Sequence, residues 1–242
     1  MKILVVNDDG INAPGIAALA RWAGKLGDVT VVAPKYEQSA RSHSIDIRNE
    51  YEAAESAVAS LPGISAHYVA SSPADCVRYA LKELKCAPDI VFSGINDGLN
   101  TGLDINYSAT AGAAAEAAIN GIRAVAFSTS THNLDCLTEA DLDNVWKFIT
   151  DTGMLSVCDY VNVNFPPEPK GLKVTRQGKQ SMYSDYFVRS ENGLVHQTGD
   201  RVDITGRDTS VDIEAVLSGF ISVTPMTTDR TAVNAYIKLK DR

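Results

Sequence analysis

The sequence predicts an α/β protein, with a parallel sheet covered by helices on both faces and a β-rich extension at the C-terminus. Through the first two thirds of the chain, runs of β-branched residues alternate with segments of helical spacing, which is typical of βα units. The strand runs are apolar along their length, as expected of strands buried on both faces. After the proline-rich segment 166–169 the pattern becomes shorter and richer in Gly, Asn and Asp.

The chain opens with a buried strand and an amphipathic helix. Residues 2–6 are aliphatic and β-branched, too few for a helix, and end at a cluster of turn-forming residues. Residues 14–25 place apolar side chains on one helical face, and Pro14 suits the first turn of a helix. A second β-branched run at 29–33 predicts the next strand, which stops at Pro34.

The next strand and helix have clear boundary signals. Residues 67–70 form a short strand pattern. Ser72 is a typical N-cap residue, Pro73 suits the first helical position, and Asp75 favours the positive end of the helix dipole. The helix that they begin reaches about residue 84.

Further apolar runs and helical patterns complete the alternation. We expect strands at residues 89–93, 124–127 and 160–164, an Ala-rich helix at 110–120 and another helix at 138–152. Residues 46–66 form an excursion between sheet strands. We divide the chain into a core, residues 1–165, and an extension, residues 166–242, because the extension has few large apolar side chains. Its expected strands are residues 172–176, 185–189, 193–196 and 220–224.

Composition excludes several classes of function. The net charge of −8 argues against a protein that coats nucleic acid, because such surfaces are basic. No stretch approaches the roughly 20 apolar residues of a membrane span, and the N-terminus does not resemble a signal peptide. The four cysteines lack C-x-x-C spacing, which favours reduced thiols in a cytoplasmic protein without a membrane partner.

Two adjacent acids, Asp8 and Asp9, come directly after the first strand. Open α/β sheets bind ligands at the carboxyl ends of their strands. Two carboxylates in one place repel each other, and a bound divalent cation removes this repulsion. The alternative is an ordinary turn, since Asn7 and Gly10 on either side also favour turns.

A loop rich in Gly and Asn follows the strand at 89–93 and reaches the same edge. Asn96 offers an oxygen ligand or an amide donor, and glycines such as Gly98 let backbone amides form an anion-binding nest. A mobile surface loop is the alternative interpretation. Ser108 and Thr110 lie at the start of the Ala-rich helix, where free amides favour an anion, although ordinary helix capping is the better explanation of these two residues taken alone.

The polar loop after the second strand supplies a further candidate, Ser39, whose hydroxyl oxygen suits a metal. A solvated loop is again the alternative. Together the oxygen donors of these loops suit a hard cation such as Mg²⁺ or Mn²⁺. The sequence lacks the G-x-x-x-x-G-K-[ST] motif of a P-loop, and it also lacks the strand-linked G-x-G-x-x-G motif of a dinucleotide-binding Rossmann site. Its four histidines do not pair as zinc ligands.

The chain resembles the SurE family (survival protein E) of metal-dependent 5'-nucleotidases and phosphomonoesterases. The resemblance covers nearly all 242 residues and rests on the segments Asn7-Asp8-Asp9-Gly10-Ile11, Gln38-Ser39, Pro73-Ala74-Asp75-Cys76-Val77, Ser93-Gly94-Ile95-Asn96-Asp97-Gly98-Leu99-Asn100-Thr101-Gly102, Tyr107-Ser108, Asn162-Val163-Asn164-Phe165-Pro166 and Val223-Thr224-Pro225-Met226.

The resemblance implies a Rossmann-like core, a C-terminal part used in homodimer or homotetramer assembly, and hydrolysis of nucleoside 5'-monophosphates, with polyphosphate as a further substrate of some members. It implies one Mg²⁺ or Mn²⁺ per subunit. The implied metal ligands are Asp8, Asp9, Ser39 and Asn96. The implied catalytic residues are Asp8, Asp9 and Asn96. The implied phosphate-binding residues are Ser39, Asn96, Gly98, Ser108 and Thr110.

The chain departs from the family pattern before Pro73, where Ser71-Ser72 replaces the usual Gly-Thr, and at the two positions where glycine usually follows the metal-binding serine and the Tyr-Ser pair. Here these positions are Ala40 and Ala109, and a methyl group there would strain a backbone that needs positive φ. Other classes of function are alternatives, of which a phosphatase with an aspartyl nucleophile is disfavoured because it needs a D-x-D motif after the first strand, where this chain has adjacent acids. A non-catalytic nucleotide sensor would keep the site without turnover. A signalling receiver domain would need a phospho-accepting aspartate where this chain has Ser93.

Overall fold

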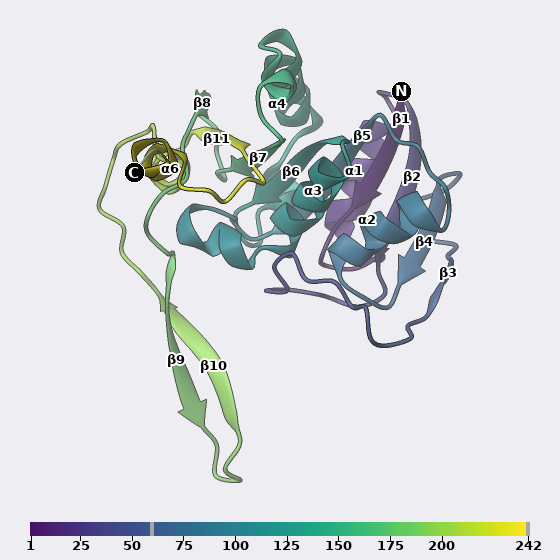
Figure 1. The fold of residues 1–242 in the computed structure, drawn as a ribbon, viewed down its shortest axis with the longest axis horizontal. Coiled ribbons are helices and arrows are strands. Elements are labelled where there is room, and N and C mark those ends of the chain that lie inside the picture. The colour runs from purple at the N-terminus through teal and green to yellow at the C-terminus, as the bar shows by residue number, and fades with distance from the viewer. Residues whose placement is uncertain (59–60, 241–242) are drawn as a thin grey trace.

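The computed structural model describes residues 1–58 and 61–240 (Figure 1). In these residues a nine-stranded sheet has the order β3-β4-β2-β1-β5-β6-β7-β11-β8. Its strands are β1 (Lys2–Val6), β2 (Asp28–Pro34), β3 (Ala53–Glu55), β4 (Ser65–Val69), β5 (Ile90–Asp97), β6 (Arg123–Thr129), β7 (Tyr160–Phe165), β8 (Leu172–Val174) and β11 (Ile221–Met226). Within this sheet, as far as the structure describes the chain, only the pairs β3–β4 and β7–β11 are antiparallel. The predicted fold class is confirmed.

Helices cover both faces of the sheet. The helices are α1 (Pro14–Ala23), α2 (Pro73–Lys82), α3 (Ala109–Ile119), α4 (Glu139–Asp151), α5 (Asp212–Leu217) and α6 (Val233–Leu239), with short 3₁₀ helices η1 (Gly102–Tyr107), η2 (Leu134–Cys136) and η3 (Met154–Ser156). Apolar residues of α1 and α4 pack in one core layer with one set of strand side chains. Residues of α2 and α3 pack with the alternate set.

Local signals set the helix ends as the sequence predicts. The Ser72 hydroxyl accepts the Asp75 amide at 3.1 Å and caps α2. Thr138 and Asp141 form a reciprocal capping box at the start of α4. Such caps satisfy amides that have no partner inside the helix, so α2 and α4 begin at defined residues.

The strand order places a crevice between β1 and β5. From β1 the chain proceeds outward through β2 and β4, and then returns to the other side of β1 to build β5, β6 and β7. Loops on either side of such a switch point separate and leave room for a ligand beyond the carboxyl ends of the strands. The loops after β1 and β5 both end at this crevice.

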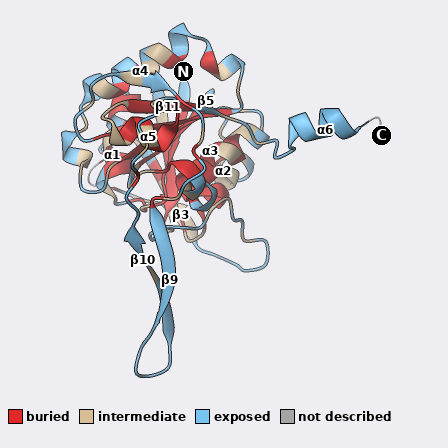
Figure 2. Cartoon of the chain, turned by 90° about the vertical axis from the view of Figure 1, so that its left-hand side faces the viewer, coloured by how far each residue is buried: buried red, intermediate tan, exposed pale blue. Residues whose placement is uncertain are grey.

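Residues after 165 contribute to the main sheet and also extend beyond it. Strand β11 pairs with β7, and β8 forms the sheet edge. A two-stranded hairpin of β9 (Tyr183–Arg189) and β10 (Val195–Arg201) projects from the body, as does α6 (Figures 1 and 2). Figure 2 shows that the hairpin and α6 are exposed along almost their whole length.

The extension differs from expectation in detail. Strands were expected at residues 172–176 and 220–224, and β8 and β11 lie there. The hairpin strands are longer than the expected 185–189 and 193–196. Helices α5 and α6 were not predicted, and the 46–66 excursion contains the short strand β3.

Candidate active site

The turn after β1 fixes the two adjacent carboxylates. The Asn7 side chain donates to the Gly10 carbonyl at 3.0 Å and accepts from the Gly10 amide at 3.3 Å. Gly10 has a φ of 103°, a conformation suited to glycine. The loop after β2 anchors this turn, because the Gln38 amide donates to the Asp8 carbonyl at 2.8 Å. Asp8 and Asp9 therefore lie on a turn held from two sides.

The end of β5 carries Asn96. At Gly94, whose φ is 132°, a Cβ atom would lie 2.3 Å from the Phe127 carbonyl oxygen on β6, so only glycine fits. The β5–β6 register shifts between Ser93 and Asn96. The Asn96 side-chain nitrogen donates to the Gly98 carbonyl at 2.7 Å. Its amide oxygen is therefore the atom that it can offer to a cation.

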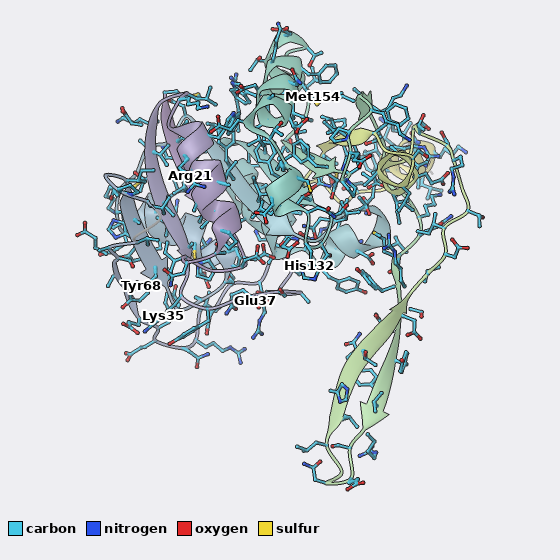
Figure 3. The ribbon with its side chains drawn as sticks, turned by 180° about the vertical axis from the view of Figure 1, so that it is seen from behind. Arg21, Lys35, Glu37, Tyr68, His132 and Met154 are labelled. Carbon is cyan, nitrogen blue, oxygen red and sulfur yellow. The ribbon has the colours of Figure 1, made fainter. Side chains whose placement is uncertain are left out.

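The loop after β2 brings a hydroxyl to the same crevice. Ser39 donates to the Glu37 carboxylate at 2.7 Å, and Figure 3 shows Glu37 at the same sheet edge as the loop of His132. Ala40 has a φ of 57°, which costs a residue other than glycine about 1–2 kcal/mol. The Ser42 amide donates to the carbonyl that ends η1 at 2.9 Å, which ties this loop to the start of α3.

The first turn of α3 completes the site. The Ser108 hydroxyl accepts the Ala111 amide at 3.0 Å, so Ser108 is the N-cap of α3. The Thr110 hydroxyl donates to Asp8 Oδ1 at 2.7 Å, and its side chain is fully buried. The helix therefore presents its positive end beside a carboxylate.

These four segments enclose a cavity of about 400 Å³. Its lining residues are Asp8, Asp9, Glu37, Ser39, Ala40, Asn96, Asp97, Asn100, Asp104, Tyr107 and Ser108. Five of the candidate residues are among them: Asp8, Asp9, Ser39, Asn96 and Ser108. Gly98 and Thr110 are not among them: the Gly98 carbonyl accepts a bond from the Asn96 side chain, and Thr110 is buried and bonded to Asp8.

Sequence reasoning did not single out four lining residues: Glu37, Asp97, Asn100 and Asp104. Asp97 and Asn100 lie inside the Gly- and Asn-rich motif, so the motif itself was the available signal. Asp104 accepts the Met182 amide at 2.8 Å at the base of the hairpin. That contact joins segments far apart in the chain, and no local pattern indicates it.

Burial and mutual repulsion favour the neutral forms of two carboxyl groups of the cavity, Asp8 and Asp9, when no cation is bound. Burial is the main cause that raises the pKa of Asp8 to about 7; the Thr110 hydrogen bond opposes this rise, and the neighbouring Asp9 carboxylate adds to it. Burial also raises the pKa of Asp9, with added repulsion from Glu37 and Asp97. Among the described residues lining the cavity there is no Lys, Arg or His. A bound cation would remove this repulsion.

The donor set fits a hard divalent cation better than zinc. It combines two carboxylates with hydroxyl and amide oxygens, which are the ligands that Mg²⁺ and Mn²⁺ prefer. In residues 1–58 and 61–240, no group of three or more His, Cys, Asp or Glu side chains is placed to hold a metal. A zinc site of the usual nitrogen and sulfur ligands is therefore not supported in this part of the chain.

A larger cavity of about 770 Å³ shares Ser108 with the first and lies beside it. It is bounded by η1, α3 and the end of β11, and its lining includes Arg176 and Arg230. The segment that leads into α6 forms part of its wall. Its lining includes neither Asp8 nor Asp9, so the smaller cavity, which both acids line, is the candidate active site.

Comparisons with known proteins identify the family of the chain. A family model described as "Survival protein SurE" matches residues 3–184. The chain belongs to the SurE family. It is 36% identical to 5'-nucleotidase SurE of Thermosipho melanesiensis, covering 100% of this chain and 97% of that protein. It is 39% identical to 5'-nucleotidase SurE 1 of Thermus thermophilus, covering 96% and 94%.

A solved structure supports the same assignment. The crystal structure of the SurE protein from Aquifex aeolicus matches with a TM-score of 0.79 at 32% sequence identity, covering 100% of this chain and 99% of that chain. Among the described residues, no helix has the length and hydrophobicity needed to cross a membrane.

The two alanines that replace glycine of the SurE pattern have different consequences. Ala40 does adopt a positive φ, so its methyl group is strained in the loop that carries Ser39. Ala109 is the first residue of α3 and is fully buried, and it is not among the residues with positive φ. Of these two substitutions, only Ala40 therefore carries backbone strain.

Proposed function

We propose that this chain is a divalent-metal-dependent 5'-nucleotidase that hydrolyses nucleoside 5'-monophosphates to nucleoside and phosphate. One observation carries the proposal: oxygen donors from three separate segments, Asp8 and Asp9, Ser39, and Asn96, line one cavity at the switch point of the sheet. The relatives with 34–39% identity that are named 5'-nucleotidase SurE support the reaction class.

The proposed ligands of one Mg²⁺ or Mn²⁺ are Asp8, Asp9, Ser39 and the amide oxygen of Asn96. When bound, such a cation lowers the pKa of a coordinated water and neutralises charge on a phosphoryl group. Asp8 and Asp9 are the candidate bases that accept a proton from the attacking water. Ser108 and the first amides of α3 are positioned to bind the phosphate oxygens, because helix N-termini favour anions.

Phosphate release from a panel of nucleoside 5'-monophosphates, with Mg²⁺, Mn²⁺ or EDTA, tests the proposal. We expect activity with metal and none with EDTA. Asp8→Asn and Asn96→Ala should each reduce the rate by at least 100-fold. Asp28→Asn, at the opposite end of the sheet on β2, is the matched control and should retain full activity. Full activity of the Asp8 or Asn96 variant would refute the site.

The same assay separates the nucleotidase from a nucleotide sensor. A sensor would bind nucleotide in a titration but release no phosphate at any metal concentration. The strained Ala40 is the feature that favours this second function, because it lies in the loop of a proposed metal ligand. Tripolyphosphate in the substrate panel tests whether polyphosphate is also hydrolysed.

The proposal includes assembly into a homodimer or homotetramer. An isolated two-stranded hairpin is marginally stable in water, yet β9 and β10 project as a long arm (Figure 2). This arm exposes several large apolar side chains: Tyr183, Tyr186, Phe187, Val188, Leu194 and Val195. Helix α6 exposes Val233, Tyr236, Ile237 and Leu239. Exposed apolar surface of this extent favours burial against other copies of the chain.

A further inference from the structure

A buried polar network lies beneath the cavity and ends at one of the proposed metal ligands. Its members are Asp8, Asn100, Thr110, Ser128, Asn162 and Asn164, each 8% exposed or less. Polar side chains are rarely buried in such number without a structural or functional reason. The segment with Asn162 and Asn164 lies on β7, remote from the carboxylates in sequence, and the proposed reaction does not use it.

The network begins with two asparagines that hold one backbone position. The side-chain nitrogens of Asn162 and Asn164 donate to the Asn100 carbonyl at 2.8 and 3.0 Å. The Asn164 side-chain oxygen accepts the Asn100 amide at 2.7 Å. Both backbone polar groups of Asn100 are therefore bound by side chains of β7. This contact fixes the Gly- and Asn-rich loop to the sheet.

The side chain of Asn100 in turn contacts Ser128 and Thr110. Its side-chain nitrogen donates to Ser128 Oγ at 2.8 Å and, in a longer contact, to Thr110 Oγ1 at 3.4 Å. Because an amide nitrogen can only donate, the Thr110 oxygen acts as acceptor in this contact. The Thr110 proton is then directed to Asp8 Oδ1, 2.7 Å away. The direction of each hydrogen bond is thus set from β7 to the carboxylate.

We propose that the Thr110 side chain is a positioning residue for Asp8, supported by Asn100 and Asn164, and does not contact the substrate phosphate. Its side chain is fully buried, its hydroxyl proton is used by Asp8, and it does not line the cavity. A bond from a fixed hydroxyl holds one carboxylate oxygen in place and leaves Asp8 Oδ2 for a ligand. Groups that orient metal ligands in this way typically change metal affinity roughly 10–100-fold when removed.

The inference rests on the proposed metal site, so the test measures metal binding apart from turnover. Binding of Mn²⁺ to nucleotide-free protein is followed by electron paramagnetic resonance of the free ion. Thr110→Val removes the hydroxyl at nearly constant volume, and we expect roughly 10–100-fold weaker Mn²⁺ binding. Thr110→Ser keeps the hydroxyl and should bind within about two-fold of the wild type. Asn164→Ala should weaken binding in the same direction as Thr110→Val.

Thr175→Val is the matched control. Thr175 is also a buried threonine, and its hydroxyl contacts Ser222 and Thr224 at 2.8 and 2.7 Å, away from the acid-lined cavity. The Thr175→Val variant loses comparable hydrogen bonds and should keep the Mn²⁺ affinity of the wild type. Inhibition by inorganic phosphate at saturating Mn²⁺ is measured on the same proteins, and it should be unchanged in Thr110→Val.

Three results would overturn the inference. Mn²⁺ affinity in Thr110→Val equal to that of the wild type, with weaker phosphate inhibition, would make Thr110 a direct phosphate ligand. A Thr110→Ser protein as weak as Thr110→Val would show that the hydroxyl is not the determinant. This second comparison remains decisive if Asn164→Ala does not fold. Absence of Mn²⁺ binding in the wild type would refute the proposed metal site itself, together with the inference that depends on it.

Discussion

The single residue with the largest conflict between folding and the proposed function is Asp8. This residue is 4% exposed and lies beside a second carboxylate, in a cavity whose described lining has no cationic side chain. The folded protein without metal therefore favours the neutral acid, and burial raises the pKa of Asp8 to about 7. A carboxyl group that binds a metal ion, however, must be ionised. The Asp8 carboxyl group therefore serves the proposed chemistry and does not stabilise the fold.

This conflict predicts a pH dependence of the metal-free protein. The folded-state pKa of Asp8 lies above the unfolded value of 3.8. The contribution of protonated Asp8 to the free energy of unfolding is therefore complete below about pH 4. It is lost as the pH rises to about 7, because the unfolded chain releases the Asp8 proton at a lower pH than the folded protein does. The loss can reach roughly 4 kcal/mol. In EDTA at pH 8, we expect Asp8→Asn to melt at a higher temperature than the wild type, with the difference disappearing near pH 4.

Thermal unfolding followed by circular dichroism at several pH values measures this effect. Asp28→Asn is the control, because Asp28 is exposed and belongs to the opposite end of the sheet. Added Mn²⁺ should stabilise the wild type at pH 8 and leave Asp8→Asn unchanged. Equal melting temperatures for the two proteins in EDTA at pH 8 would contradict the assigned role of burial.

At the scale of elements, the loop after β2 depends on a contact with α3. The His43 ring nitrogen lies 2.7 Å from a carboxylate oxygen of Glu116, whose other oxygen accepts a bond from Arg78 at 3.1 Å. Burial raises the pKa of Glu116, but its hydrogen bonds from His43, Arg78 and Asn120 outweigh burial and lower it overall. The buried carboxylate thus fastens a loop that also contains positive-φ residues.

Removing this contact should loosen the loop locally. In His43→Ala we expect trypsin to cleave after the exposed Arg41 several-fold faster than in the wild type, because cleavage requires local opening. Cleavage sites are identified by mass spectrometry. His67→Ala, in which the lost contact is a 3.4 Å bond to Ser65, is the matched control. If both variants are cleaved after Arg41 at the wild-type rate, the His43 contact does not hold the loop.

Much of the core could be predicted from the sequence because local and tertiary preferences agree there. The expected strand at 2–6 has the observed bounds, and Ser72 caps α2 as expected. The paired acids were placed correctly at the carboxyl end of β1, because a buried strand followed by a Gly turn has few alternatives. The apolar runs that led to these predictions are the same residues that fill the two core layers.

The rest depended on contacts that leave no local pattern. Helix α5 has six residues, too short for a helical period to be recognised. Strand β10 is polar and exposed on both faces, so it lacks the alternation that marks a half-buried strand. The direction of the Thr110 hydroxyl depends on Asn100 and Asp8, which are 10 and 102 residues away in the chain.

At the scale of the whole molecule, the hairpin and α6 form two exposed arms that differ from the compact body in the burial of their apolar side chains. The body buries most of its apolar side chains in two core layers, whereas Phe187 in the hairpin is 69% exposed and Ile237 in α6 is 58% exposed. Asp104 and Ser181 join the hairpin base to η1, whose residues line the candidate cavity. Contacts made by the hairpin therefore reach the wall of the site.

We expect Phe187→Asp and Ile237→Asp each to shift the chain toward smaller species, because a charge placed in an apolar interface must be desolvated without a partner. Light scattering coupled to size-exclusion chromatography, over a range of protein concentrations, measures the mass. Val157→Asp is the control, since Val157 is 83% exposed on the body next to η3 and should leave the mass unchanged. A wild-type chain that is monomeric at all concentrations would contradict assembly through the arms. Unchanged mass in both variants would place the interface on another surface of the body.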